Sequence, residues 1–337
     1  MRPLEIGGGE NFRHKTCGED ADIVVDGSAD LEELNNILDG ASSGDKVFLE
    51  SDVEIDMGFD EDGVTVTVPE NVTLASDRGC NGSSGALLIG GEKPGTEWVG
   101  SRAIAMKADS KIAGLRFEGP APDREMNWMG EEFDYTDGIE GRGENVVVEN
   151  NELYGWPTAA VRGGSDPIEV RHNYIHSNNQ RGLGYGVSTV DWPSVIEYNR
   201  FERNRHAVAG SGEEGEGYIV RYNTFGGEGI AGAGHKIDMH GDNGDGGSKI
   251  EVYRNTVKYP DSQAVYLRGE PVDYAEIRDN WFYNDNEYCL SDEAGGSGYC
   301  SVRLTASDWS SVDLSGNHLG RSEPGCGVGA PRLECVE

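Results

Sequence analysis

Three ionisable side chains of different types, Lys236, Asp238 and His240, alternate with Ile237 and Met239 in one short apolar segment. Successive side chains of a β-strand point to opposite faces, so the three would project from one face. An amine, a carboxylate and an imidazole in contact can orient and transfer protons, and strand packing requires none of them. We therefore predict a catalytic site at this segment. The alternative is a set of hydrogen-bonded residues without a catalytic role.

A repeat in the second half of the chain indicates what holds this segment in place. Seven times, a short apolar run is followed by an Asn, one variable residue and another apolar residue. The spacings between these asparagines are 22, 26, 24, 32, 25 and 37 residues, roughly one solenoid coil each with insertions. Unrelated hairpins would not place Asn at the same point of seven units. The seven are Asn151, Asn173, Asn199, Asn223, Asn255, Asn280 and Asn317.

Each repeat unit reads as two or three short β segments divided by Gly, Asn and Asp, without a helical period of useful length. Such units bury their apolar side chains only by stacking, with coils about 4.8 Å apart. An Asn at an inward corner can bond the Asn or the backbone above and below, and it tolerates the left-handed turn conformation. We predict an all-β fold, a parallel β-helix solenoid.

The region before the repeats contains the pattern of one helix, from Asp30 to Gly40. Asp30 and Glu33 have capping-box form, and Gly40 lies where a helix would end. A solenoid needs its open apolar end covered, so this helix is predicted to be the N-terminal cap. The expected divisions are an N-terminal segment with capping helix at 1–44, a β-helix at 45–288, and a last coil with a Cys-containing C-terminal cap at 289–337.

The repeat also sets the register between coils. Alignment on inward residues Val161, Val187, Val208, Ile237 and Val265 places Tyr266 beside Asp238, and Arg268 beside His240. Small residues on the neighbouring coils leave a trough, whose long charged edges could hold an anionic or hydroxylated chain. The predicted catalytic residues are Lys236, Asp238, His240 and Tyr266. The predicted substrate-binding residues are Arg162, Tyr185, Arg205 and Arg268.

A metal site is a further prediction of this register. His206 and His235 occupy equivalent places on adjacent coils and could stack about 5 Å apart. With Asp238 and His240 they would form a set of three imidazoles and a carboxylate able to hold a divalent metal, calcium or a transition metal. Strict alternation would turn His206 and His235 inward, unless the corner of the coil falls there.

Composition limits the partners. The chain has 61 acidic and 28 basic residues and a net charge of -33, so it would repel nucleic acid and gain no affinity from counterion release. Acidic surplus with few lysines is typical of proteins in a high-salt environment, where molar salt screens self-repulsion. The sequence contains no run of about 20 apolar residues, which a membrane-spanning helix would need. The N-terminus also lacks the apolar core of a signal peptide, so either a leader was removed or the protein leaves the cell another way, as a virion component would.

Six cysteines at 17, 80, 289, 300, 326 and 335 indicate disulfides in an oxidising compartment. Fifteen pairings are possible, and proximity favours Cys289 with Cys300, Cys326 with Cys335, and Cys17 with Cys80. A zinc site is the competing interpretation, although no Cys-x-x-Cys spacing occurs.

Three segments carry a family resemblance: 182–187 (GLGYGV), 198–209 (YNRFERNRHAVA) and 235–241 (HKIDMHG). They resemble a family of right-handed parallel β-helix proteins of pectin-lyase-like form, found in haloarchaea and bacteria; Val72 to Gly79 also resembles an early coil of that family. The resemblance covers most of residues 20 to 290. It implies the fold more specifically than any activity, and better-known β-helix enzymes act on acidic polysaccharides. The paired-Asp and Gly-His-Gly pattern of the polygalacturonases is absent, which counts against a hydrolase of their type.

These observations favour an extracellular carbohydrate-active protein acting on an acidic polysaccharide, most plausibly a lyase. Proton abstraction beside a uronate carboxylate needs a cation and a base, and a hydrolase would instead need two carboxylates, such as Asp238 and Asp242. The alternative is a non-enzymatic protein of a haloarchaeal virus or cell surface, such as a tail spike or capsid decoration, that binds glycans. The short Cys-bearing C-terminal segment neither supports nor excludes a homotrimer or assembly into a larger particle.

Overall fold

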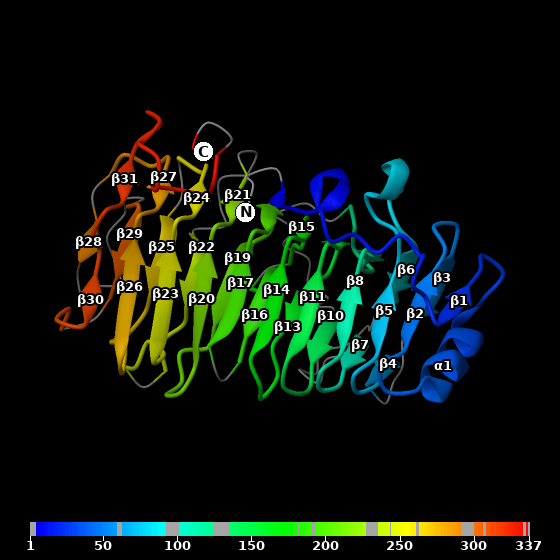
Figure 1. Cartoon of the computed structure of the whole chain (residues 1–337). Coiled ribbons are helices and arrows are strands. Elements are labelled where there is room, and N and C mark those ends of the chain that lie inside the picture. Colours follow the sequence, from blue (N-terminus) through cyan, green and yellow to red (C-terminus); the bar gives the residue numbers. More distant parts are fainter. Residues whose placement is uncertain are drawn as a thin grey trace.

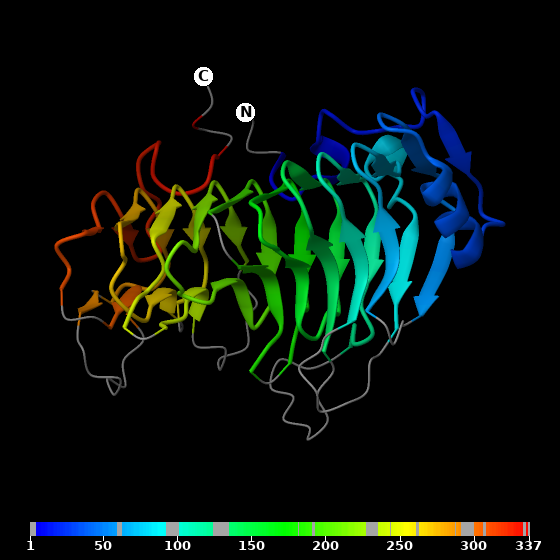
Figure 2. The same ribbon diagram turned by 90° about the horizontal axis from the view of Figure 1, so that it is seen from below.

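The structure is a computed structural model of the 337-residue chain. It describes residues 5–58, 63–91, 101–123, 135–180, 182–190, 193–226, 235–242, 244–260, 263–286, 288–290, 300–305, 308–332 and 335. Short strands follow one another around a single solenoid axis, and coils stack along that axis from the N-terminal helix to the C-terminal segment (Figure 1). Figure 2 shows the same stack from below.

Three sheets, here named A, B and C, run the length of the stack, and every strand pair joined by a backbone ladder is parallel. The strands of sheet A are β1 (Ile23–Val25), β2 (Lys46–Leu49), β5 (Thr73–Ala75), β8 (Lys111–Ala113), β11 (Val146–Glu149), β14 (Ile168–Arg171), β17 (Ser194–Glu197), β20 (Gly217–Arg221), β23 (Lys249–Tyr253), β26 (Tyr274–Arg278) and β30 (Val312–Asp313). The strands of sheet B are β3 (Glu54–Gly58), β6 (Leu87–Gly90), β9 (Arg116–Glu118), β12 (Glu152–Tyr154), β15 (Tyr174–His176), β18 (Arg200–Glu202), β21 (Thr224–Phe225), β24 (Thr256–Val257), β27 (Trp281–Phe282) and β31 (His318–Leu319).

Sheet C carries the predicted site. Its strands are β4 (Val64–Val68), β7 (Ser101–Met106), β10 (Thr136–Gly141), β13 (Ala159–Arg162), β16 (Tyr185–Thr189), β19 (His206–Gly210), β22 (His235–Met239), β25 (Gln263–Leu267), β28 (Cys289–Leu290) and β29 (Val302–Leu304). One strand from each sheet makes one coil, so residues tens of positions apart become neighbours. The prediction of an all-β parallel β-helix is confirmed.

All seven predicted asparagines form one continuous ladder. Each Asn side-chain amide donates to the side-chain oxygen of the next Asn at 3.0 or 3.1 Å, from Asn151 through to Asn317. The same oxygen also accepts the backbone N–H of the preceding Asn, as Asn223 does from Asn199 at 2.8 Å. The amide nitrogens bond carbonyls on an adjacent strand. Buried backbone groups at the corner are thereby paired, which explains why the repeat needs Asn.

The left-handed residue of this corner is the one before the Asn, so the tolerance of Asn for that conformation is not used at the ladder position itself. Asn150, His172, Tyr198, Tyr222 and Asp279 all have φ between 55° and 58°. The ladder Asn therefore supplies hydrogen bonds, and its predecessor supplies the turn.

Helix α1 (Leu31–Gly40) covers the first coils, as predicted. Asp30 caps it by accepting the backbone N–H of Glu33 at 3.0 Å. Leu34 and Leu38 are buried and belong to the hydrophobic core that runs through the coils. Pairing in sheet A already begins with β1, ahead of the helix.

All three disulfides predicted from proximity are present: Cys17–Cys80, Cys289–Cys300 and Cys326–Cys335. The chain before β1 runs along the outside of the stack toward its middle coils (Figure 1), where the N–H of Gly7 donates to the carbonyl of Tyr198 at 2.9 Å. Among the described residues, none of the helices has the length and apolar character needed to cross a membrane.

Candidate functional site

The outer face of sheet C presents side chains from two rows of residues. One row contains Asp137, Ala159, Tyr185, His206 and His235, which lie opposite one another on successive strands. The other row lies three residues later in each strand and matches the predicted order: Arg162, Ser188, Ala209, Asp238 and Tyr266. The register derived from the Asn repeat is therefore confirmed.

Both rows face outward because two successive residues between them face the core. Ala207 and Val208 in β19 are both buried in the hydrophobic core, and so are Ala264 and Val265 in β25. The strand bends at this corner of the coil, so strict alternation fails for one residue. His235 and Asp238 consequently lie on the same face, although they are three positions apart.

Lys236 occupies the first of these inward positions and is separated from the predicted site. Its side chain is buried, with 2% of the residue exposed, and its Nζ lies 4.2 Å from the centre of the Tyr259 ring. Burial lowers the pKa of Lys236 to about 8. The prediction that Lys236 shares an outward face with Asp238 and His240 was wrong, because the bend turns it toward the aromatic interior of the corner.

Asp238 is the buried centre of a cluster formed by His206, His235, Asp238, His240 and Arg268, which we call the Asp238 cluster. Its Oδ2 lies 2.7 Å from His240 Nε2, 3.0 Å from His235 Nε2 and 2.7 Å from the Nη2 of Arg268. Arg268 Nε also donates to Oδ1 at 3.1 Å. Burial raises the pKa of Asp238, but hydrogen bonds with His235 and His240 outweigh it and hold that pKa well below its usual range. The carboxylate is ionised.

His206 is the member of this cluster that comes from the neighbouring strand, β19. Its ring stacks on that of His235 with 4.1 Å between centroids, as the register predicted. Its Nδ1 lies 2.8 Å from the carbonyl oxygen of His235, which can only accept, so Nδ1 carries the proton. Its Nε2 is buried, has no hydrogen-bond partner and lies 3.9 Å from Asp238 Oδ2. Burial, with His235 nearby, holds the pKa of His206 well below its usual value.

Tyr266 and Arg268 close the cluster from the next coil. The Tyr266 ring packs edge-on against His235 at 5.1 Å. Two guanidinium groups lie against the same ring, that of Arg268 at 4.8 Å and that of Arg303 at 5.0 Å. Tyr266 therefore holds Arg268 in place over Asp238 through cation–π contact.

A hollow of about 280 Å³ continues from the Asp238 cluster along the two rows toward β10, and we call it the trough. His240 and Tyr185 line one end, and Arg102, Asp137 and Arg162 line the other. Between them, small residues form the floor, as predicted: Ser188, Ala209, Gly210 and Ser211. The trough runs parallel to the solenoid axis across several coils, a shape suited to a linear polymer.

Tyr185, which lines the trough near His240, lies next to Arg205. The Tyr185 ring stacks on His206 at 5.7 Å and meets the edge of His240 at 6.3 Å. Its hydroxyl donates to the carbonyl of Gly182 at 3.1 Å. Burial raises the pKa of Tyr185, and the nearby Arg205 guanidinium opposes that rise. Two of the four predicted substrate-binding residues, Tyr185 and Arg205, are thus beside the Asp238 cluster.

Asp137 is a functional candidate that the sequence reasoning missed. It is buried at the far end of the trough, where its Oδ2 lies 3.7 Å from Arg162 and 4.0 Å from Arg102, and its Oδ1 has no hydrogen-bond partner. Burial raises the pKa of Asp137 to about 6, although Arg162 and Arg102 oppose the rise. Continuing the register to Ile139, which pairs with Val161, would have found it.

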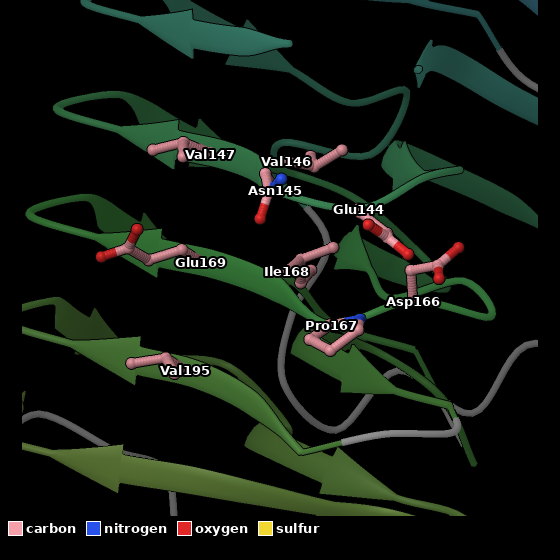
Figure 3. Close-up of a pocket in the computed structure, with 9 residues that line it drawn as sticks. All are labelled: Glu144, Asn145, Val146, Val147, Asp166, Pro167, Ile168, Glu169 and Val195. Atoms are coloured by element: carbon pink, nitrogen blue, oxygen red, sulfur yellow. The ribbon is translucent and has the colours of Figure 1, made fainter. Parts of the chain in front are cut away.

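Two other parts of the surface do not join this site. Asp242, considered as a second carboxylate, is exposed in the turn after β22 and pairs with Asp245. A larger hollow of about 510 Å³ lies between the start of β11 and that of β14 (Figure 3). Its charged side chains include Glu144, Asp166 and Glu169, and apolar residues such as Ile168 make up much of the rest. Among the described residues that line it, none is a cation that could bind an acidic ligand.

Comparison with solved structures shows the same fold. The chain is similar to an alginate lyase from Paenibacillus sp. str. FPU-7, with 16% identity over 89% of this chain and 100% of that one and a TM-score of 0.52. It also matches pectate lyase Pel9A (11% identity, 90% and 81% coverage, TM-score 0.46) and an exopolygalacturonase from Yersinia enterocolitica (10%, 89% and 79%, 0.34). No family model and no curated protein matches the sequence. The fold is a right-handed parallel β-helix.

Proposed function

We propose that this protein is a polysaccharide lyase that cleaves an acidic polysaccharide in the trough. The observation that carries the proposal is the position of His240, which lies on Asp238 at the edge of a trough lined by arginines. A lyase removes the proton from the carbon that bears the uronate carboxylate, breaks the adjacent bond to the glycosidic oxygen, and leaves a carbon–carbon double bond. It needs a base, a cation and a proton donor.

His240 is the proposed base. Because the ionised Asp238 carboxylate can only accept, His240 donates its Nε2–H at 2.7 Å. This tautomer leaves Nδ1 as the nitrogen with a lone pair, in the way that a buried carboxylate orients a catalytic histidine. About a third of the His240 side chain is exposed to the trough, in contrast to the buried Asp238.

Arg162 and Arg268 are the proposed cations, one toward each end of the trough. Their side chains remain about one-third exposed while they contact Asp137 and Asp238. A guanidinium can bind a uronate carboxylate through two parallel hydrogen bonds. Tyr185, whose ring meets that of His240, is the proposed donor to the leaving oxygen, and its hydroxyl would turn from the Gly182 carbonyl to donate there. Tyr266, which was predicted to be catalytic, is instead proposed to hold Arg268. Lys236, also predicted to be catalytic, takes no part in the proposed reaction.

The position of the arginines supports an anionic substrate, although the protein as a whole is acidic. A protein with a net charge of -33 repels polyanions over most of its surface. Arg102 and Arg162 nevertheless line the trough, and Arg268 and Arg303 lie over the Tyr266 ring next to the Asp238 cluster. Positive side chains concentrated in one place are expected to draw an acidic chain to it. Three disulfides favour an extracellular location for this activity, and the charge favours a high-salt one.

A glycoside hydrolase is the second candidate, because Asp137 has the property of a general acid. Its pKa of about 6 keeps part of it protonated near neutral pH. Glu140, three residues along the same strand, contacts Arg102 and Arg142 and could act as the second carboxylate. Hydrolysis yields no double bond, so the products distinguish the two reactions.

The test is to incubate the purified protein at low and high salt with pectate, alginate, glycosaminoglycans and haloarchaeal surface polysaccharide. Ultraviolet absorbance reports unsaturated uronates, and a reducing-end assay reports any cleavage. We expect absorbance to rise, with His240→Gln and Asp238→Asn lowering kcat at least about 100-fold. His176→Gln is the matched control, because His176 lies on sheet B, where it contacts Glu152.

Two results would contradict a lyase, and a third would contradict only the assignment of His240 as its base. Reducing ends without absorbance, abolished in Asp137→Asn, would establish hydrolysis instead. Absorbance that His240→Gln leaves unchanged would remove the proposed base. Tight binding of a polysaccharide without any product would indicate a non-enzymatic glycan-binding protein of a cell surface or virion.

A further inference from the structure

We propose that His206, His235 and Asp238 bind one divalent transition-metal ion beneath the trough, and that the ion displaces the Arg268 guanidinium. The side-chain ligand atoms of these three residues all lie within 4.8 Å of one another. This inference goes beyond the proposed reaction, because the site would bind metal whether or not the trough is catalytic.

Hydrogen bonding leaves His206 Nε2 unexplained. The residue is 1% exposed, and its Nδ1–H is committed to the carbonyl of His235. The lone pair on Nε2 therefore has no donor to satisfy it, and an unsatisfied buried acceptor lowers the stability of the fold. A metal-binding histidine usually holds the ion with one ring nitrogen and donates the N–H of the other to an acceptor such as a backbone carbonyl.

His235 has a related conflict. Its Nε2 lies 2.8 Å from Arg268 Nη2, which can only donate, and 3.0 Å from Asp238 Oδ2, which can only accept. A ring nitrogen carries either a hydrogen or a lone pair, so one of these two contacts is always mismatched. A cation held by both Nε2 and Oδ2 removes the mismatch.

The distances fit a small metal ion. With bonds of about 2.0–2.1 Å, two ligands of a tetrahedral site lie roughly 3.3 Å apart. Asp238 Oδ2 is 3.0 Å from His235 Nε2 and 3.9 Å from His206 Nε2. All three ligand atoms lie within 4.8 Å of one another, so the stacked His206 and His235 rings must approach and tilt toward each other to place their nitrogens on one ion.

The scaffold holds these ligands in place. His206 and His235 begin adjacent strands β19 and β22, and their rings stack on one another. Tyr185 packs against His206 from one side, and Tyr266 packs against His235 from the other. Ligands fixed in this way lose little freedom on binding, which favours affinity.

The donor types select the metal. Two imidazole nitrogens and one carboxylate suit Zn²⁺, Co²⁺ or Ni²⁺, whereas Ca²⁺ and Mg²⁺ prefer shells of oxygen ligands. We therefore choose a transition metal over calcium.

Arg268 is the competitor for this site. Its Nη2 contacts the same two atoms that would bind the ion, Asp238 Oδ2 and His235 Nε2. The side chain is 34% exposed, so the guanidinium can swing outward into the trough while the buried ligands stay. Metal and guanidinium cannot occupy one position because both are cations, so binding of one releases the other.

The experiment measures metal binding and needs no substrate. The protein is stripped with EDTA and dialysed, then titrated with Zn²⁺ by calorimetry, while metal content is measured by mass spectrometry. Co²⁺ substitution gives a visible absorption spectrum that reports its coordination. We expect one Zn²⁺ per chain, and a loss of affinity of at least about 100-fold in His206→Ala. Arg268→Met is expected to bind Zn²⁺ about 10-fold more tightly.

His318→Ala is the matched control, because His318 lies in β31 and bonds the backbone of Ser322. Thermal unfolding verifies that each variant is folded. Absence of stoichiometric Zn²⁺ binding in the wild-type protein would overturn the proposal, as would unchanged affinity in His206→Ala. If His206→Ala does not fold, Arg268→Met decides: equal or weaker binding than wild type would contradict a shared position. Lyase activity can fail in all of these proteins without affecting the result.

Discussion

At the scale of single residues, the trough and the adjoining Asp238 cluster contain buried ionisable side chains that folding alone does not favour. Asp137 is buried with one oxygen unpaired, and His206 is buried with one nitrogen unpaired. Each costs stability, and neither could be retained for packing, since an apolar side chain would fill the same space without that cost. Asp137 lines the trough and His206 lies beside His240 at its other end, and buried polar groups kept at such a cost are typical of functional surfaces.

The unfavourable burial of Asp137 predicts how stability changes with pH. The folded chain has a pKa of about 6 at this carboxyl against the ordinary 3.8, so between these values it holds a proton that the unfolded chain has lost. Stability from this residue is full below about pH 4 and is lost as pH rises through 6. Asp137→Asn should raise the free energy of unfolding by about 3 kcal/mol at pH 7 and change it little at about pH 3.5.

Urea unfolding at both pH values measures this difference. Glu70→Gln, which changes an exposed carboxylate, is the control and should alter neither value. An equal effect of Asp137→Asn at the two pH values would show that the carboxyl keeps an ordinary pKa.

At the scale of elements, the Asn ladder connects the sheets at one corner of each coil from Asn151 to Asn317. Asn223 in the middle of the ladder accepts from Asn199 and donates to Asn255 and to the carbonyl of Ile196. Asn317 is the last residue of the ladder and is partly exposed. The same residue type therefore has different numbers of buried partners along the stack.

The ladder predicts a dependence on position. Asn223→Ala leaves the buried N–H of Asn199 and the carbonyl of Ile196 without partners, and should cost about 3–4 kcal/mol. Asn317→Ala should cost about 1 kcal/mol, because water replaces some of its bonds. Thermal unfolding followed by circular dichroism compares the two. Equal costs would mean that the ladder contributes no more in the interior than at its end.

Much of this architecture could be predicted from the sequence because Asn marks the same point in each coil. The register of Asp238 with Ala209 and Tyr266 followed directly. The direction of Lys236 could not, because the bend that turns two successive residues inward is a backbone property that apolar periodicity does not encode. Asp137 was missed for a related reason: its coil precedes the first Asn of the repeat, so no marker aligned it.

At the scale of the whole molecule, an elongated solenoid distributes a net charge of -33 over its surface. Like charges destabilise the folded chain through repulsion, which salt screens over about 10 Å at 0.1 M and about 3 Å at 1 M. One disulfide lies near the N-terminal end of the stack and two lie near the C-terminal end. They therefore do not counter the repulsion between charges that are spread along the solenoid.

We expect the melting temperature to rise by at least about 5 °C between 0.1 and 2 M KCl, by relief of repulsion. Differential scanning calorimetry measures it, with sucrose as an uncharged control for preferential exclusion. A melting temperature that stays constant or falls with KCl would show that the acidic surface does not limit stability.

The N-terminal segment determines the order in which this molecule can be completed. Glu5 receives a hydrogen bond from His172, and Gly7 bonds Tyr198 and Arg78. These partners lie up to about 190 residues later in the chain, so during synthesis the first residues emerge long before the surface that receives them exists. The coils can stack one upon another as they appear, but this segment must wait unpaired. Residues 5–7 thus reach their native position only after the coils that contain His172 and Tyr198 have formed.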